Sequence, residues 1–237
     1  FFLPLMTVYL YNTTRYFSGL NTSQLFTNFT RFYDFAWELV FAVDLVIVTA
    51  GYILTLKLLD SHIRTSESTV GGWLVAIICY EPFWSAVSVG YLAYNKDNYN
   101  WGNWLAGNDI ATMIWGGMIL LLITIYSLSS VAFGIRFSNL THRGIITTGP
   151  YRYCKHPAYL SKNMSWWLVA IPFISTSGDI SLIIQSCLML LVLNAIYYLR
   201  AKTEEQHLSW DETYRQYLSA IEQRGLWAKS KRLIKGK

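Results

Sequence analysis

The sequence predicts an all-α membrane protein, a polytopic bundle of about five to six transmembrane helices. Apolar residues make up 53% of the 237 residues and charged residues only 14%, whereas soluble domains carry about 25% charged residues. The mean hydropathy is positive, at +0.29. Several apolar runs also reach the length of about 20 residues that is needed to cross a bilayer.

Five apolar segments are predicted to span the membrane: 35–57, 70–95, 110–134, 159–175 and 179–199. Residues 1–11 are too short to span alone and are compatible with the end of a helix whose beginning is missing. Residues 12–34 are expected to form a polar loop. Because only STSGD separates the last two spans, they predict a tight helical hairpin. Residues 200–237 are polar and predict an amphipathic tail.

The distribution of Lys and Arg predicts the orientation of these segments. The 135–158 loop contains four basic residues and the tail from Arg200 contains nine, whereas the 96–109 loop contains only Lys96. Because basic loops face the cytoplasm, we expect the 58–69 and 135–158 loops and the C-terminus to be cytoplasmic. The net charge of +5 fits this bias, or attraction to anionic lipids. No nucleic-acid recognition module is visible.

The stretch GPYRYCKHPAYLSKN, residues 149–163, is a polar cluster between two apolar runs. Proline is favoured as the first residue of a helix, so Pro157 predicts a helix start with His156 at its cap. The free N–H groups of such a helix attract a carboxylate or phosphate, and Arg152 and Lys155 would add donors. Alternatively, the basic and tyrosine side chains are anchors at the membrane interface.

The end of the last span carries a second group of polar residues. Tyr197, Arg200, Glu204 and His207 fall on one face of a helix, while Glu205 faces elsewhere. This face would direct a guanidinium and a carboxylate into the bundle just below the membrane. Alternatively, it is a solvated helix end with a weak Arg200–Glu204 pair.

Three acidic residues, Glu38, Asp44 and Glu81, lie inside predicted spans. Ionisable groups at this depth are candidates for a functional site, or they satisfy polar groups between helices. The four histidines have no ligand-like spacing, so we expect no metal site. Cys79 and Cys187 are interpreted as small apolar helix residues.

Two stretches together resemble the isoprenylcysteine carboxyl methyltransferase family, which includes phospholipid N-methyltransferases. They are HRGIITTGPYRYCKHPAYL, residues 142–160, and YYLRAKTEEQHLSWDETYRQYL, residues 197–218, with an apolar hairpin between them. The resemblance covers about residues 134–220. It implies an integral membrane methyltransferase that uses S-adenosyl-L-methionine and acts on an apolar or lipid-linked carboxylate, amine or thiol.

The resemblance also implies a division of roles. Residues 134–237 would form the methyltransferase half, and residues 1–133 would form the acceptor side. Arg200 would face the methyl acceptor. The residues implied to bind the cofactor are Arg136, Arg143, Gly144, Ile145, Ile146, Tyr151, His156, Pro157, Ala158, Tyr159 and Glu204.

The chain departs from the family pattern at two positions. Lys155 replaces the usual Arg before His-Pro, and a point charge cannot reproduce a bidentate fork. Ser161 replaces the usual Gly two residues after Tyr159. These departures keep a non-catalytic membrane scaffold open as an alternative. A membrane reductase of the sterol type, using NADPH, is a further alternative.

Overall fold

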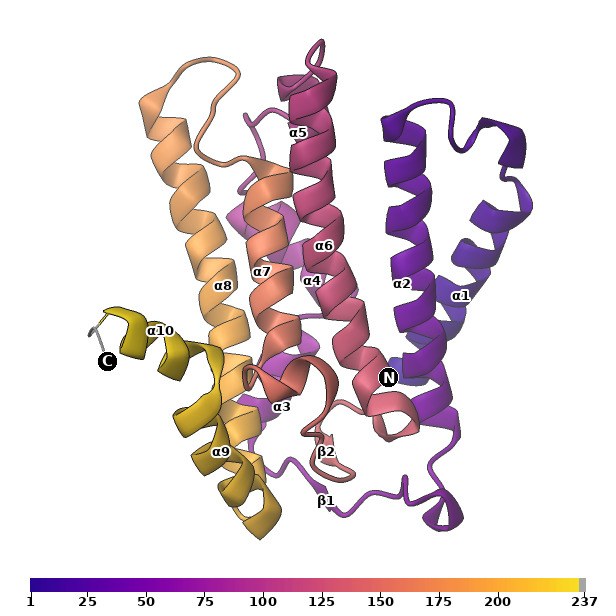
Figure 1. Cartoon of the computed structure of the whole chain (residues 1–237), viewed down its shortest axis with the longest axis vertical. Coiled ribbons are helices and arrows are strands. Elements are labelled where there is room, and N and C mark those ends of the chain that lie inside the picture. Colours follow the sequence, from indigo (N-terminus) through magenta and orange to yellow (C-terminus); the bar gives the residue numbers. More distant parts are fainter. Residues whose placement is uncertain (235–237) are drawn as a thin grey trace.

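The structure is a computed structural model that describes residues 1–234, and it is a bundle of helices (Figure 1). The central helices are α2 (Phe29–Ile53), α6 (Asp109–Phe133), α7 (Pro157–Ala170) and α8 (Ile180–Leu208). Helix α6 packs against both α2 and α7, and α7 packs against α8. The predicted all-α bundle and its C-terminal hairpin are therefore confirmed.

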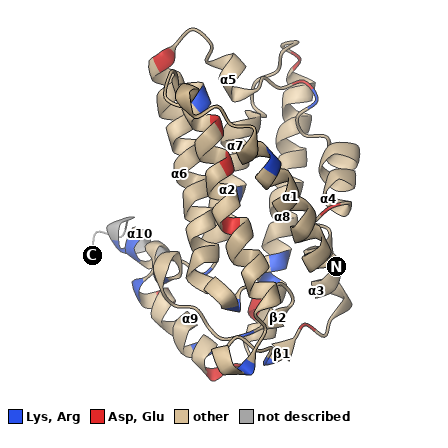
Figure 2. Ribbon diagram, turned by 90° about the vertical axis from the view of Figure 1, so that its right-hand side faces the viewer, with Lys and Arg blue, Asp and Glu red and all other residues tan. Residues whose placement is uncertain are grey.

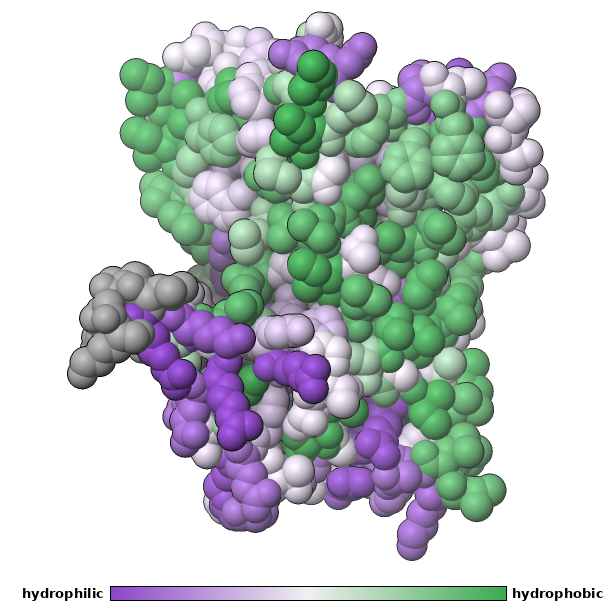
Figure 3. Space-filling model, in the orientation of Figure 1, coloured by the Kyte–Doolittle hydropathy of each residue, from purple (hydrophilic) through white to green (hydrophobic). Residues whose placement is uncertain are grey.

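Three helical stretches are long and apolar enough to cross a membrane: Phe29–Ile53, Asp109–Arg136 and Ile180–Leu208. Their outward faces carry exposed apolar side chains such as Val46, Leu121 and Leu188, and Figure 3 shows a broad apolar band across the face of the bundle that it draws. Helical backbone satisfies its own hydrogen bonds, as a lipid environment requires. The chain is thus built to lie in a bilayer.

Polar side chains begin each of these helices. Asn28 accepts a hydrogen bond from Arg31 N at 2.9 Å, and Asn108 accepts one from Ala111 N at 3.0 Å. Asp179 does the same for α8, accepting from Ser181 N at 2.8 Å. Such caps satisfy backbone donors that the helix leaves free.

The prediction of a polar loop over residues 12–34 is wrong at both ends. Helix α1 (Phe2–Ser18) continues past residue 12, a short 3₁₀ turn follows at Thr22–Gln24, and α2 already begins at Phe29. Thr14 donates its hydroxyl to the Leu10 carbonyl at 2.8 Å, so a polar side chain is accommodated on the helix surface. Helix α1 packs along α2.

The segment 70–95, which we expected to span the membrane, is not one continuous helix. It contains α3 (Val70–Ile77), the short α4 (Phe83–Ser85) and a π-helical stretch at Ala86–Leu92. Pro82 follows a cis peptide bond between α3 and α4. Proline lacks the N–H that a helix needs and its ring clashes with the preceding turn, so the run breaks there. The short α5 (Trp101–Trp104) follows.

One end of the bundle carries most of the polar structure, at the bottom of Figure 1. Strands β1 (Thr65–Ser66) and β2 (Thr141–His142) pair antiparallel there. Short 3₁₀ turns lie at Lys57–Leu59, Gly134–Arg136 and Gly149–Arg152, and α9 (Glu212–Arg224) and α10 (Leu226–Ile234) form the tail. Lys and Arg gather around these elements in Figure 2. We call this region, residues 54–69, 134–156 and 205–234, the polar end.

Candidate functional site

The segment between α6 and α7 is fixed by the two short strands. Thr65 pairs with His142, and the backbone N–H groups of Arg64 and Glu67 donate to His142 O and Leu140 O, each at 2.8 Å. Gly144 has a φ of +124°, which side-chain-bearing residues rarely adopt. These hydrogen bonds therefore fix the backbone conformation of this segment at the polar end.

Helix α7 starts as the His-Pro step predicts. Pro157 is its first residue and His156 occupies the cap position, although the His156 side chain makes no capping hydrogen bond. Instead, His156 Nε2 lies 3.0 Å from Glu205 Oε1, and Lys155 Nζ lies 2.7 Å from the same oxygen. Lys202 reaches the other oxygen of Glu205 at 2.8 Å. Lys155 and His156 thus both contact a carboxylate of the protein itself.

The inner face of α8 directs four side chains toward a single cavity. Tyr197, Arg200, Glu204 and His207 all line it, as their spacing along one helix face requires. Glu205 is outside the lining and points toward Lys155. Helical periodicity alone therefore separates the two adjacent glutamates.

Arg200 is the buried centre of this face, with an exposed fraction of 6%. Its Nε lies 3.4 Å from Glu204 Oε1, and one of its terminal nitrogens donates to Asn139 Oδ1. The guanidinium also lies 5.4 Å from the ring centre of Tyr80 and 5.2 Å from that of Tyr159. Tyr159 in turn donates its hydroxyl to Glu204. A buried cation is thus compensated by a carboxylate, an amide and two aromatic faces.

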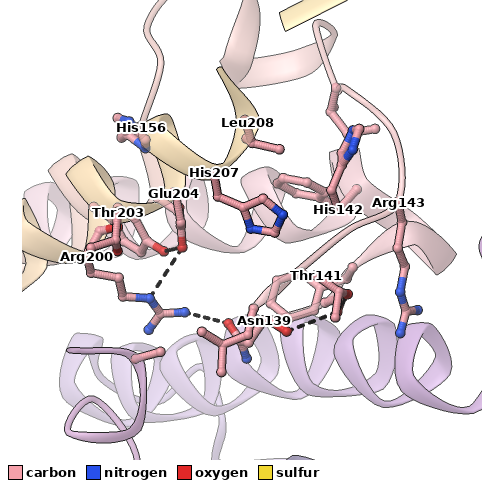
Figure 4. A pocket seen from close by; sticks show the side chains of 18 of the residues that line it. Asn139, Thr141, His142, Arg143, His156, Arg200, Thr203, Glu204, His207 and Leu208 are labelled. Atoms are coloured by element: carbon pink, nitrogen blue, oxygen red, sulfur yellow. Dashed lines mark hydrogen bonds and ion pairs between the residues drawn. The ribbon is translucent and has the colours of Figure 1, made fainter. Parts of the chain in front are cut away.

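Asn139 joins this group to the first half of the chain. Its Nδ2 lies within hydrogen-bond distance of the hydroxyl oxygens of Tyr52, at 2.6 Å, and Tyr80, at 2.8 Å, while its Oδ1 accepts from Arg200. Figure 4 shows Asn139 opposite Arg200 and Glu204. One amide therefore connects α2, the segment after α3, and α8.

The cavity has a volume of about 210 Å³ and is drawn in Figure 4. We call it the polar cavity. Of the twelve residues proposed from the sequence, Pro157 alone is not among its lining residues; it is buried in the first turn of α7. The others line it together: Arg136, Arg143, Gly144, Ile145, Ile146, Tyr151, His156, Ala158, Tyr159, Arg200 and Glu204.

Two of these residues are also engaged elsewhere in the protein. Arg136 pairs with Asp60, where its Nε donates to the Asp60 carbonyl at 3.1 Å. Arg143 is 5% exposed and donates from Nη1 to the Gly51 carbonyl at 2.6 Å. Each arginine thus also ties the segment after α6 to the end of α2 or the turn that follows it.

Sequence reasoning missed several lining residues, among them Tyr80, Asn139, His142 and Lys162. Lys162 had a detectable signal, because it lies three residues after Tyr159 and therefore on the same face of α7. Asn139 had none, since its partners are 59 to 87 residues away in the sequence. Among the described residues, no three His, Cys, Asp or Glu side chains form a group that could hold a metal ion.

Burial shifts the ionisation of groups at the polar end. Desolvation lowers the pKa of His142, although the Asp211 carboxylate opposes this, with its Oδ2 3.6 Å from His142 Nε2. Burial also lowers the pKa of Arg143 and raises the pKa of the Cys154 thiol. His142 thus favours its neutral form, and Cys154 is a poor nucleophile.

Residues 110–210 match the family model described as Isoprenylcysteine carboxyl methyltransferase (ICMT) family. The resemblance deduced from the two motifs is therefore confirmed for this part of the chain. No curated protein and no solved structure gives a significant match.

The region that matches the isoprenylcysteine carboxyl methyltransferase family covers a little under half of the chain, from the start of α6 to just beyond α8. It contains all twelve proposed site residues. The remaining walls of the polar cavity come from outside it, through Ala76, Cys79 and Tyr80 near α3 and through Tyr214 and Tyr217 in α9. The first half of the chain therefore contributes directly to the same cavity.

Proposed function

We propose that this protein is an S-adenosylmethionine-dependent methyltransferase that methylates an apolar or lipid-linked acceptor. One observation carries the proposal: residues of the family-matched region form a cavity in which a buried guanidinium and a carboxylate face the same space. A structural helix end would not need to enclose these groups. The family match is the independent support for methyl transfer.

The side chains that line the polar cavity are of the chemical types that this cofactor would need. Its carboxylate calls for cationic or N–H donors, and its amine and sulfonium call for a carboxylate and aromatic faces. On the cavity-lining residues Arg143 and His142, the buried atoms Nε and Nε2 have no hydrogen-bond partner among the described residues. Glu204 and Tyr159 supply the anionic and aromatic groups. When bound, the cofactor supplies an electrophilic methyl group.

The residues of the protein would then hold and orient the reactants, which is the main requirement for methyl transfer. Glu204 would bind the amino end of the cofactor, and the segment Arg143–Ile146 would line it. Arg200 would face the methyl acceptor. An acceptor carboxylate needs no base, whereas an amine or thiol must first lose a proton.

We also infer that the polar end lies in the cytoplasm, where the cofactor is available. The density of Lys and Arg in the 135–158 loop and in the tail supports this orientation. A membrane-impermeant maleimide should label a cysteine introduced at Gln216, on α9, only when the cytoplasmic face is accessible. Labelling from the opposite side would contradict this orientation.

The direct test of the function is calorimetric titration with S-adenosylhomocysteine. We expect saturable binding to the wild-type protein and clearly weaker binding to Glu204→Gln. Glu212→Gln is the matched control, because Glu212 lies on α9, is paired with Arg215 and is not part of the cavity. Absence of binding to the wild type, or binding of NADPH instead, would overturn the proposal.

A further inference from the structure

A groove with four basic side chains lies on the surface of the polar end. Its walls come from the 3₁₀ turn Gly149–Arg152, from α9 and from α10, and its volume is about 700 Å³. The basic residues that line it are Arg152, Arg224, Lys229 and Arg232, and we call it the basic groove. Figure 2 shows Lys and Arg on α9 and α10 in this part of the molecule.

The basic groove contains no compensating negative charge from the part of the chain that the structure describes. None of its lining residues is Asp or Glu, and both glutamates of α9 lie outside it. The four basic side chains form no ion pair with any described residue, in contrast to Arg215 of α9, which pairs with Glu212. Because like charges that gather in one place repel one another, the groove favours an anionic ligand.

Hydrogen bonds hold the walls of the basic groove together. Tyr217 of α9 donates its hydroxyl to the Tyr151 carbonyl at 2.8 Å, and the first backbone N–H of α10 donates to the Tyr153 carbonyl at 2.9 Å. Arg232 donates from Nη2 to the Gln223 carbonyl at 2.6 Å and so fastens α10 to α9. The basic side chains therefore project from elements that are attached to one another.

The position of α10 indicates that the anion belongs to a lipid. Helix α10 lies higher than α9 in Figures 1 and 2, toward the apolar part of the bundle. Its sequence, LWAKSKRLI, combines apolar and basic residues, as in helices that lie at a membrane surface. Tyr153, which lines the groove, and Leu226, which begins α10, are half exposed. A tyrosine and an apolar side chain at this level suit the membrane interface.

We propose that the basic groove binds the head group of an acidic phospholipid from the adjacent membrane leaflet. Arginine and lysine are the side chains that proteins use to bind phosphate oxygens. A choline or ethanolamine head group would also bring an ammonium group, for which the described lining offers no carboxylate. The groove therefore selects a head group with net negative charge. This inference does not depend on methyl transfer.

The bound lipid would also act on the polar cavity, because Tyr217 lines both that cavity and the basic groove. Tyr214, on the same helix, lines the polar cavity as well. A head group held between the turn Gly149–Arg152 and α9 would keep these two tyrosines in place. The basic groove is thus an attachment point for the membrane surface at one wall of the polar cavity.

Native mass spectrometry of the full chain, released from detergent micelles, tests this inference because it resolves each bound lipid. The protein is titrated with phosphatidylglycerol or with phosphatidylcholine that carries the same acyl chains. We expect the first phosphatidylglycerol to bind about tenfold more tightly than the first phosphatidylcholine, since each basic residue near an anionic head group contributes about a fivefold gain in affinity. Equal binding of the two lipids to the wild type would overturn the inference without the use of any variant.

Variants locate the effect in the groove. Arg224→Gln should weaken binding of the first phosphatidylglycerol about fivefold, and Lys229→Arg, which keeps the charge, should bind it like the wild type. Arg215→Gln is the matched control, because it removes the same charge from α9 outside the groove and should leave the affinity unchanged. Equal losses in Arg224→Gln and Arg215→Gln would mean that net charge alone attracts the lipid, and the inference would then be wrong.

Inorganic phosphate distinguishes a lipid site from a site for a soluble anion. The phosphatidylglycerol titration of the wild type is repeated with phosphate in large molar excess over the lipid. We expect most of the bound lipid to remain, because its acyl chains and the interfacial residues of α10 also hold it. Complete displacement by phosphate would assign the groove to a soluble anion and contradict the proposal. Thermal unfolding in detergent verifies that Arg224→Gln is folded.

Discussion

Glu204 and Glu205 are neighbours in α8, yet they belong to two different regions of the molecule. Glu204 faces the polar cavity and accepts from Tyr159 and Arg200. Glu205 faces the start of α7 and binds Lys155, His156 and Lys202. Because adjacent helical residues point about 100° apart, two identical side chains reach different partners.

The two carboxylates differ in how far the protein's own side chains already occupy their hydrogen-bonding capacity. The partners of Glu205 are three cationic or potentially cationic side chains of the protein, so its charge serves to attach α8 to the loop before α7. Glu204 has a single cationic partner, and its side chain is 39% exposed, facing a cavity of about 210 Å³. We therefore interpret Glu204 as a recognition group and Glu205 as a structural one.

The largest effect is expected for Arg200→Leu, which removes the buried partner of both Glu204 and Asn139. Leaving a buried polar group such as Asn139 unpaired costs about 1–3 kcal/mol, so this variant should unfold at a clearly lower temperature and show no methyl transfer. Lys202→Leu removes a partner of Glu205 at an exposed position, where an ion pair contributes at most about 1 kcal/mol. Thermal unfolding in detergent compares the two, and equal losses would contradict the distinction between the regions.

The next largest effect separates the two glutamates themselves. Glu204→Gln should weaken S-adenosylhomocysteine binding about tenfold or more, as expected for the loss of a charged hydrogen-bond partner. Glu205→Gln should lower the unfolding temperature while leaving this affinity nearly unchanged. Calorimetric titration and thermal unfolding of both variants give the two readouts. If Glu205→Gln weakens binding as strongly as Glu204→Gln, their assigned roles are wrong.

The parts of the site that follow from local geometry could be predicted from the sequence. Tyr197, Arg200, Glu204 and His207 share a face because the helical repeat fixes their directions, and Pro157 begins α7 because its missing N–H is harmless there. These properties depend on a few neighbouring residues only. The all-α bundle followed in the same way from the apolar runs.

The parts that depend on tertiary contacts could not be predicted. Asn139 contacts Tyr52, Tyr80 and Arg200, which are all distant in the sequence. Its local sequence, Asn139-Leu140-Thr141, matches only a glycosylation motif. Tyr80 and Lys162 both line the polar cavity although they lie in distant parts of the sequence. The assignment of cofactor and acceptor roles to these residues stays a prediction.

Gly51→Ala tests the support that α2 gives to the polar cavity, with an intermediate effect. A Cβ atom at Gly51 would lie 2.7 Å from the Phe137 carbonyl oxygen, while the Gly51 carbonyl accepts from Arg143. We expect a loss of about 1–3 kcal/mol, as for other overpacked sites, together with weaker cofactor binding.

The matched control for this variant is Gly71→Ala, because a Cβ placed at Gly71 would meet no atom within 4 Å from the rest of the described chain beyond its own helix turn. Alanine is also the better helix former at that position in α3. Thermal unfolding should therefore show a loss for Gly51→Ala and none for Gly71→Ala. A Gly51→Ala protein of unchanged stability would show that α2 and the segment after α6 can separate at little cost.

The smallest effect concerns pH and His142, which lines the polar cavity. Because burial lowers the pKa of His142, the unfolded chain takes up a proton at about its ordinary pKa of 6.5, before the folded protein does. This part of the stability should therefore be constant above this pH and decrease as the pH drops below it. Asp211 limits this loss of stability, since it attracts the protonated ring.

Unfolding temperatures of the wild type and His142→Gln across this pH range provide the measurement. The variant should lose this part of the pH dependence, and a wild-type protein that becomes more stable on mild acidification would instead mean that the ion pair with Asp211 outweighs burial.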